Sequence, residues 1–536
     1  KAPHASVTHN EAYNYTWENI LSYNTTIAQD HNVGITGVTS WQKNTAEEYL
    51  AGGNDQMVDS WYWYRMISST PVRLNSGYTR TQKMSYAVRL NYSYKGKYLA
   101  TFSNRWDGVS FFSKGNKWAS FPAGALAWRI SDEAFMKGTK NWLDNLKLRL
   151  GAGITGNSGG VGAYATTTNV YQYSSAGVSV DGKYVPFVQY SGTYGSSNLS
   201  WEKSYNWNVG LDFGFLHGRI DGTIDAFSTK TKGLLFKRNM PITTGLTGWG
   251  WTLASWQNLA KTANKGVEFT INSRNIVTRN FTWSTTLTGT WQKEKIESLP
   301  EGDLINENLF EGQPIHAVYG YKYAGIWGTD ASAEDLATYG VKPGWTKIET
   351  VPIIDKDGNS DEGKHKYSEK YDRQILGHEN PNWILGLNNT FTYRGFDLTV
   401  YMMARLGQTF RSDLLGRYTA KSSITTNQIA GTDYWTENNQ GAYYPAPGVG
   451  DDQSAGYNAF TYFDGSFLKI KNITLGYTLP QQLTRKVLIQ KARVYFTAYN
   501  PWIICDSKLK HTDPEMGGND AFPTYKQFVF GINITL

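Results

Sequence analysis

The stretch MSYAVRLNYSYKGKYLATFSNRWD, residues 84–107, predicts two amphipathic strands joined by a tight turn. In the first strand, apolar or aromatic side chains occupy every second position, as in a strand with one apolar face: Met84, Tyr86, Val88, Leu90, Tyr92 and Tyr94. The alternation resumes after the Lys95-Gly96 turn. Each strand runs for about ten residues, the length that a strand tilted by roughly 45° needs to cross a bilayer. The stretch therefore predicts one hairpin of a transmembrane β-barrel.

The same alternation recurs along the whole chain and gives about fifteen candidate strands. We expect strands at 15–24, 32–42, 84–94, 98–106, 118–130, 146–155, 206–215, 219–229, 267–271, 281–292, 383–393, 396–406, 467–478, 492–499 and 527–536. The fold class that this pattern predicts is all-β, a transmembrane antiparallel β-barrel.

Short and long connections alternate between these strands. The short ones are 95–96, 217–218, 273–278 and 394–395, and the long ones are 43–83, 156–204, 231–263, 293–381 and 407–466. Outer-membrane barrels combine short periplasmic turns with long extracellular loops in this way. If the last strand ends in the periplasm, the first one runs inward and the strand count is odd, whereas bacterial single-chain barrels use even numbers. We therefore expect residues 1–536 to be the C-terminal part of a barrel.

Two places depart from regular alternation. Within 467–478 the apolar phase slips between Ile470 and Ile473, which predicts a β-bulge. Pro122 lies inside a candidate strand, where it cannot donate a ladder hydrogen bond, so we expect a local break there.

Composition excludes several classes of function. The chain has no run of about 18 or more apolar residues, which excludes a transmembrane helix, and its single Cys505 excludes an internal disulfide. The net charge of +7 is spread along the chain without a Lys/Arg block, so we expect no nucleic-acid partner. The eight His residues lack metal-ligand spacing, and no catalytic constellation is present. We therefore expect neither an enzyme nor a metal or cofactor site.

Several long motifs resemble, in order, the C-terminal portion of SusC/RagA-type TonB-dependent outer-membrane transporters of Bacteroidetes. They are YKGKYLATFSNRWDG, WASFPAGALAWRIS, NLKLRLGAGITGN, LSWEKSYNWNVGLDFGFLHGRIDGTIDAF, NKGVEFTI, EGQPIHAVYGYKYAGIW, DRQILGHENPNWILGLNNTFTYRGFDLTVYM, FLKIKNITLGYTLP and ARVYFTAYN. The resemblance implies a 22-stranded barrel around an N-terminal plug domain, a TonB-contacting segment and a SusD-like lipoprotein lid. By this comparison the plug domain and first barrel strands are absent from the chain.

Two features depart from the family's pattern. The chain ends on Leu536 where such proteins usually end on an aromatic residue. The segment DKDGN, residues 355–359, resembles part of a calcium loop, but Gly358 is at the wrong position and the distal Glu is not at the required spacing. A plain turn is the better interpretation.

Consecutive aromatic residues in the long loops are the candidate contact residues for a substrate or a lid protein. One group is Trp61, Tyr62, Trp63 and Tyr64, and a second contains Trp249, Trp251 and Trp256. Flat aromatic faces can stack on sugar rings, whereas the structural alternative is packing within the loops. Arg89, Arg105, Arg149 and Arg405, on the polar face of the strands, either line a solute path or make structural contacts.

The function that follows is energised import of a bulky nutrient, an oligosaccharide in preference to a peptide. The expected partners are a SusD-like surface lipoprotein, the TonB complex and outer-membrane lipid, and the expected location is the outer membrane. Two alternatives stay open, namely a passive porin and a soluble secreted carbohydrate-binding β-protein. A barrel would expose apolar rows such as Trp207 to Phe215 and aggregate in water, whereas a soluble protein would not.

Overall fold

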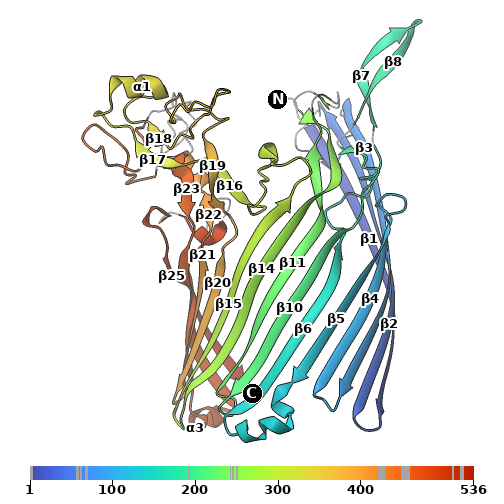
Figure 1. Ribbon diagram of the computed structural model, residues 1–536, viewed down its shortest axis with the longest axis vertical. Helices are drawn as coiled ribbons and strands as arrows, with labels where there is room; N and C mark the ends of the chain where they lie inside the picture. The colour runs from blue at the N-terminus through green and yellow to red at the C-terminus, as the bar shows by residue number, and fades with distance from the viewer. Residues whose placement is uncertain are drawn as a thin grey trace.

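A curved antiparallel sheet makes up most of the computed structural model (Figure 1). The structure describes residues 4–55, 60, 63–64, 66, 70–168, 170–190, 193–241, 243, 247–248, 251–419, 429–447, 459–509, 512–518 and 524–536. None of the helices in these ranges is long and apolar enough to span a membrane.

The fifteen expected strands are confirmed, each pairing antiparallel with its neighbour in the chain-order path. They are β1 (His4–Ile27), β2 (His31–Asn54), β3 (Thr70–Tyr94), β4 (Tyr98–Val109), β5 (Trp118–Arg129), β6 (Leu143–Asn157), β10 (Glu202–Phe215), β11 (Ile220–Asn239), β14 (Ala254–Val277), β15 (Phe281–Ser298), β20 (Trp383–Tyr393), β21 (Phe396–Leu406), β24 (Phe467–Thr478), β25 (Lys491–Ile504) and β26 (Gln527–Thr535). A short further strand, β9 (Thr193–Tyr194), pairs in parallel with the start of β14. Among the described residues, β1 and β26 form the two edges of this sheet.

Tight turns gather at one end of the sheet, which we call the turn end (Figure 1). The residue pairs Lys95-Gly96, His217-Gly218 and Arg394-Gly395 all have positive φ angles, between 46° and 93°. Two successive left-handed residues match the twist of the flanking strands, which is why Gly follows in each pair. The alternation of short and long connections is therefore confirmed for these hairpins.

The opposite end, which we call the loop end, carries the smaller elements. Its strands are β7 (Val170–Val180), β8 (Lys183–Tyr190), β12 (Thr247–Gly248), β13 (Trp251–Thr252), β16 (Ala317–Tyr321), β17 (Tyr323–Ile326), β18 (Thr346–Ile348), β19 (Arg373–His378), β22 (Thr409–Arg411) and β23 (Tyr462–Asp464). Short helices there are η5 (Ile305–Glu307), α1 (Ala333–Tyr339), α2 (Asp413–Thr419), η9 (Ser507–Leu509) and η10 (Pro514–Met516). At the turn end lie η2 (Ile130–Asp132), η3 (Ala134–Thr139), α3 (Gln481–Thr484) and η8 (Arg485–Val487).

Three predicted connections were wrong in their bounds. The loop at 43–83 is shorter than expected because β2 continues to Asn54 and β3 already begins at Thr70. The loop at 231–263 shortens in the same way, since β11 and β14 pair up to Asn239 and Ala254. Both extensions continue the hydrogen-bond ladder without a clear apolar alternation, so the period-two signal disappears while the strands persist. The turn expected at 273–278 is mostly strand, with a register shift after Arg274.

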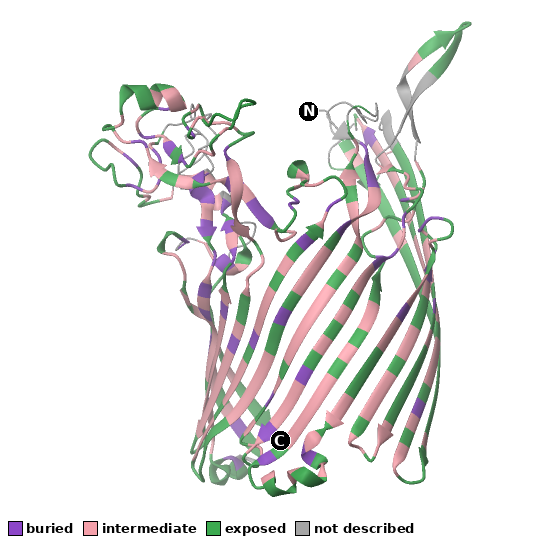
Figure 2. Cartoon of the chain, viewed as in Figure 1, coloured by how far each residue is buried: buried purple, intermediate pink, exposed green. Residues whose placement is uncertain are grey.

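Exposed apolar rows cover one face of the sheet, which we call the apolar face; the opposite face is the inner face. Exposed and partly buried residues alternate along the strands in Figure 2. On β10 the apolar row runs from Tyr205 to Phe215. These ten steps of about 3.3 Å, tilted by about 45°, span roughly 23 Å along the membrane normal, close to the apolar band of about 25 Å in outer-membrane barrels. On β15 the row from Phe281 to Trp291 has the same length. The apolar face thus has the dimensions of a lipid-facing band.

The predicted β-bulge is confirmed, and the break expected at Pro122 occurs only toward β6, because β5 pairs with β4 across Pro122. The register of β24 shifts on both sides between Ile470 and Asn472, so Lys471 is the bulged residue. The β5–β6 ladder extends only to the Ala123–Gly153 pair, next to Pro122. Pro122 lacks the N–H needed to continue the ladder.

Placing a charge on the apolar face is expected to destabilise the protein. Leu211 lies mid-row between Leu148 and Ile224, so Leu211→Arg should lower the free energy of unfolding in lipid by about 2–4 kcal/mol. Asn208→Arg, on the inner face of the same strand, is the control and should change it little. Urea unfolding of the protein folded into vesicles measures both, and equal effects would contradict the assignment of the faces.

Candidate functional site

An ion-pair network on the inner face links three strands. The Arg149 guanidinium on β6 donates two parallel hydrogen bonds to the Asp225 carboxylate on β11, at 2.9 and 2.8 Å. Its Nε donates to Asp212 Oδ1 on β10, at 2.8 Å. Gly210 lies in register between Arg149 and Asp225, and a Cβ there would stand 2.7 Å from the guanidinium carbon. Glycine is therefore required where the arginine crosses β10.

A second arginine crosses a glycine in the same way near the other edge. Arg493 on β25 donates to both oxygens of Asp397 on β21, at 2.9 and 2.5 Å. The guanidinium passes over Gly476 of β24, where a Cβ would lie 2.3 Å from Arg493 Nη2. Two bidentate pairs of this kind fix the spacing and register of the strands they cross.

The four arginines expected on the inner face have different surroundings. Arg149 and Arg105 are engaged, and Arg105 donates to Asp107 Oδ1 at 2.7 Å and to Ser85 Oγ at 2.8 Å. Arg89 is exposed, and the buried Nε of Arg405 has no hydrogen-bond partner among the described residues. The structural interpretation holds for Arg149 and Arg105, and the solute-path interpretation stays a prediction for Arg89 and Arg405.

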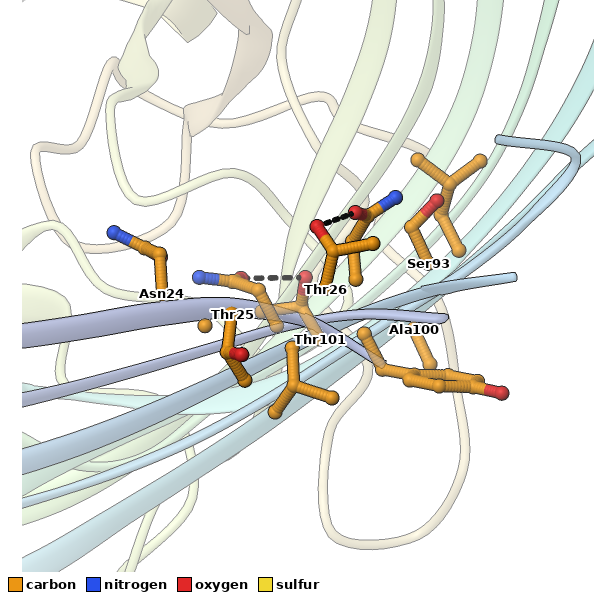
Figure 3. Close-up of a pocket in the computed structure, with 12 residues that line it drawn as sticks. Asn24, Thr25, Thr26, Ser93, Ala100 and Thr101 are labelled. Carbon is orange, nitrogen blue, oxygen red and sulfur yellow. Dashed lines mark hydrogen bonds between the residues drawn. The ribbon is translucent and has the colours of Figure 1, made fainter. Parts of the chain in front are cut away.

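Neutral polar side chains line a pocket of about 450 Å³ near the turn end of β1–β4 (Figure 3). Thr26 Oγ1 donates to Asn32 Oδ1 at 2.7 Å, and Thr101 Oγ1 donates to Asn91 Oδ1 at 3.0 Å. Amides and hydroxyls that can both donate and accept leave this part of the inner face wettable but uncharged.

The described parts of the long connections fold into an ordered rim at the loop end. Among the small cores that hold them, Phe410, Leu415, Phe463 and Leu509 form one, and Tyr444 and Phe460 form a second. Tyr323 and Tyr443 pack against the second core, and the Tyr323 hydroxyl donates to the Tyr443 carbonyl at 2.7 Å. Burial raises the pKa of Tyr444 to about 12. The rim is thus a preorganised surface rather than a set of independent loops.

A histidine between two carboxylates anchors residues 351–372 of the rim. His365 Nδ1 lies 2.6 Å from Asp361 Oδ2, and its Nε2 lies 3.0 Å from Asp372 Oδ1. Asp372 is fully buried and also accepts from the backbone N–H groups of Ser368 and Val351. The segment DKDGN forms a turn, in which Asp355 Oδ1 accepts from the N–H groups of residues 357 and 359. Within the described ranges, no three His, Cys, Asp or Glu side chains are grouped in a way that suits a metal ion.

A buried lysine attaches η10 to the barrel wall. Lys469 on β24 is 2% exposed, and its ammonium donates to Asp513 Oδ2 at 2.5 Å and Glu515 Oε2 at 2.7 Å. Lys471, the bulged residue, donates to Glu515 Oε1 at 2.8 Å. Burial raises the pKa of the Glu515 carboxyl, but the two ammonium groups outweigh it and hold that pKa below its ordinary value of 4.5.

Removing the buried ammonium is expected to release η10. Lys469→Met should lower the free energy of local opening by roughly 3 kcal/mol, because Asp513 loses its ammonium partner in a mostly buried site and Glu515 keeps only Lys471. Lys471→Met, the more exposed control, should cost less than about 1 kcal/mol. Because the pKa of Glu515 is lowered on folding, the attachment should also weaken as the pH falls below about 4.5. Hydrogen exchange at residues 512–517 measures all three, and equal protection in the two variants would contradict this role.

The structure describes only part of the predicted aromatic groups. Trp63 and Tyr64 are 53% and 74% exposed, with ring centroids 4.6 Å apart. Trp61, Tyr62 and Trp249 lie outside the described residues, and only the backbone of Trp251 is described, in β13. Trp256 does not join an exposed cluster; it is half-buried against the core around Leu199 and Trp201, as in the structural alternative.

Sequence reasoning missed a pocket of about 490 Å³ where β15 extends beyond β20. Its lining includes Trp291, Glu294, Gln313, His378 and Asn380. Asn380 donates to Glu294 Oε1 at 2.8 Å, and His378 Nδ1 lies 2.6 Å from the Asn380 carbonyl oxygen. Gln313, His378 and Asn380 lie in the segments EGQPIH and GHENPN, which the sequence analysis used only as signs of family resemblance, and Trp291 was expected only as a strand residue.

Comparisons with known proteins agree with this fold. TonB-dependent receptor P3 of Formosa agariphila is 30% identical over 548 residues, covering 96% of this chain and 52% of the relative. TonB-dependent receptor SusC of Bacteroides thetaiotaomicron is 34% identical over 477 residues, covering 85% and 44%. The RagAB peptide transporter structure superposes with a TM-score of 0.81 at 22% identity, covering 99% of this chain and 56% of that one, which shows a shared fold.

The chain spans about half the length of the curated relatives it matches. The match to the family described as TonB dependent receptor-like, beta-barrel, covers residues 3–500. Together with the fifteen-strand sheet and its apolar face, this match shows that the chain belongs to the TonB-dependent receptor β-barrel family, and that it is similar to SusC.

Proposed function

We propose that the complete protein is an outer-membrane transporter that imports a bulky nutrient with energy from TonB. The observation that carries the proposal is the family match over residues 3–500. The polar inner face supports it, because a solute that crosses the sheet's enclosed space meets amides, hydroxyls and paired charges. An ordered rim at the loop end offers a surface on which a SusD-like lipoprotein docks. The exposed apolar rows argue against a soluble secreted protein.

The residues of this chain supply the C-terminal part of the barrel in this proposal. β1 and β26 each have one sheet neighbour among the described residues, and unpaired strand edges are costly in hydrocarbon. Strands from outside this chain pair with both edges, and a plug domain fills the enclosed space. The curated relatives, about twice as long, have the length for such additional parts.

An oligosaccharide is the proposed substrate class, with a peptide as the second candidate. The exposed Trp63–Tyr64 pair presents two aromatic faces at the loop end, where a sugar ring can stack. The pocket near Trp291 adds amide, carboxylate and imidazole groups that suit hydroxyls. The structurally similar RagAB protein is named a peptide transporter, so peptides are included as the second substrate class to be tested.

Uptake by cells tests the transport mechanism. Cells that make the full-length protein should take up a fluorescent oligosaccharide too large for porins, and deletion of TonB or collapse of the proton gradient should abolish uptake. A passive porin would continue to admit the solute without TonB, and that outcome would refute the proposal. A parallel assay with a labelled peptide distinguishes the two substrate classes.

The aromatic pair at the loop end can be tested separately. Changing Trp63 and Tyr64 together to Ala should weaken substrate or lid binding by roughly 1–4 kcal/mol, at about 1–2 kcal/mol for each lost anchor, without affecting barrel folding. Trp142→Ala is the matched control, since this half-exposed tryptophan stacks on Phe215 at the turn end. Calorimetry with the purified full-length protein measures the affinity. Unchanged affinity in a folded double variant would favour the loop-packing alternative.

A further inference from the structure

Seven lysines gather on the apolar face at the loop end of four neighbouring strands. They come from β10, β11, β14 and β15, which lie side by side in the centre of Figure 1, and we call them the lysine patch: Lys203, Lys230, Lys232, Lys261, Lys265, Lys293 and Lys295. All except the half-buried Lys203 are exposed. The sequence spreads these residues over more than ninety positions, and only the strand register brings them together.

Like charges face each other directly within the patch. Lys232 is the register partner of both Lys203 and Lys261, and Lys265 is the partner of Lys293. Directly opposed like charges destabilise an antiparallel sheet. Within the described part of the chain, the ion pairs include one carboxylate for the seven lysines, Glu297, at 3.4 Å from Lys230. The patch therefore carries a largely uncompensated positive charge.

The patch begins where the apolar band ends. On β10, Tyr205 is the aromatic residue of the row nearest the loop end, and Lys203 is the next residue on the same face in that direction. On β15, Lys293 and Lys295 lie on the same face, one and two steps beyond Trp291 toward the loop end. On β14, Lys265 lies one step beyond Val267 in that direction. One two-residue step along a tilted strand rises by about 5 Å, so the ammonium groups stand at the level of lipid headgroups.

A shallow, open apolar groove of about 600 Å³ adjoins the patch on the same face. Small residues, Gly124 and Ala152, form part of its lining, together with the larger Phe102, Ile154 and Trp207. Tyr205 and Lys230 also line it, and Lys232 Nζ stands 5.0 Å from the centre of the Tyr205 ring. An extended hydrocarbon chain fits such a groove, with its polar end directed at the lysines.

We propose that this surface binds a phosphorylated lipid of the outer leaflet, with an acyl chain in the groove and the phosphate among the lysines. Phosphate oxygens offset the repulsion between the opposed lysines, and the groove orders the chain. An acidic polysaccharide or an acidic protein could meet the charge, but neither uses an apolar groove within the membrane band. The combination of the two features identifies a lipid.

Lipid binding by the purified full-length protein in detergent tests the proposal. Native mass spectrometry would compare a phosphorylated lipid A with the same lipid after enzymatic removal of its phosphates. We expect at least tenfold tighter binding of the phosphorylated form. Each lysine near a lipid surface contributes about fivefold in affinity, so the Lys230→Gln, Lys265→Gln, Lys293→Gln triple variant should lose roughly 100-fold and with it the preference for phosphate. Ala152→Phe, which fills the groove, should weaken binding of both lipids.

The controls separate this site from general attraction to charge. Gln at Lys114, Lys356 and Lys364, three exposed lysines at the loop end, should leave lipid binding unchanged. If the triple variant does not fold, the single Lys265→Gln variant, with about a fivefold loss, carries the same test. Equal affinity for the two lipids, or full binding by a folded triple variant, would overturn the proposal. So would lysine-dependent binding of polygalacturonate with no effect of the lysines on lipid.

Discussion

The backbone hydrogen-bond ladder is the constraint on which the rest of this structure depends. In hydrocarbon, every unpaired N–H or C=O costs several kcal/mol, so strands must pair with their neighbours along the whole apolar band. The ladders of β10, β11, β14 and β15 run through this band with register shifts only near their ends. Once the ladder is fixed, alternation assigns every side chain to lipid or to the inner face, and the register decides which residues become neighbours across strands.

Much of the fold could be predicted from the sequence because alternation and turn chemistry act locally. The hairpin of residues 84–107 combines both signals, and its strands occur where they were expected. Prediction failed where strands leave the lipid, as in β2 beyond residue 42, since polar residues then occupy both faces and only the ladder marks the strand. The rim could not be predicted either. Its cores join residues such as Phe410 and Leu509, which are far apart in the sequence and carry no periodic signal.

The candidate site could be predicted less well than the fold. Exposed aromatics are visible in the sequence, but whether they pack or stay exposed depends on the folded loop: Trp63 is exposed and Trp256 packs against a core. The pocket near Trp291 combines residues from β15, residues 312–314 and residues 378–382. This pocket forms because β15 continues past Trp291, where its pairing with β20 ends. Sequence alone gives the residue types there, and it gives no indication that they surround one space.

The distribution of paired and unpaired charge distinguishes the two faces of the barrel wall. On the inner face, Arg149 and Arg493 each meet carboxylates across a glycine, so these cations are neutralised within the wall. On the apolar face, lysines oppose lysines at the edge of the band with a single ion-paired carboxylate among the described residues. Carboxylates are placed beside arginines on the inner face, whereas a single carboxylate is paired with the lysines on the apolar face among the described residues. The uncompensated charge therefore agrees with an anion supplied by the membrane, and the pairing of Arg149 and Arg493 on the inner face agrees with a solute recognised mainly by hydrogen bonds.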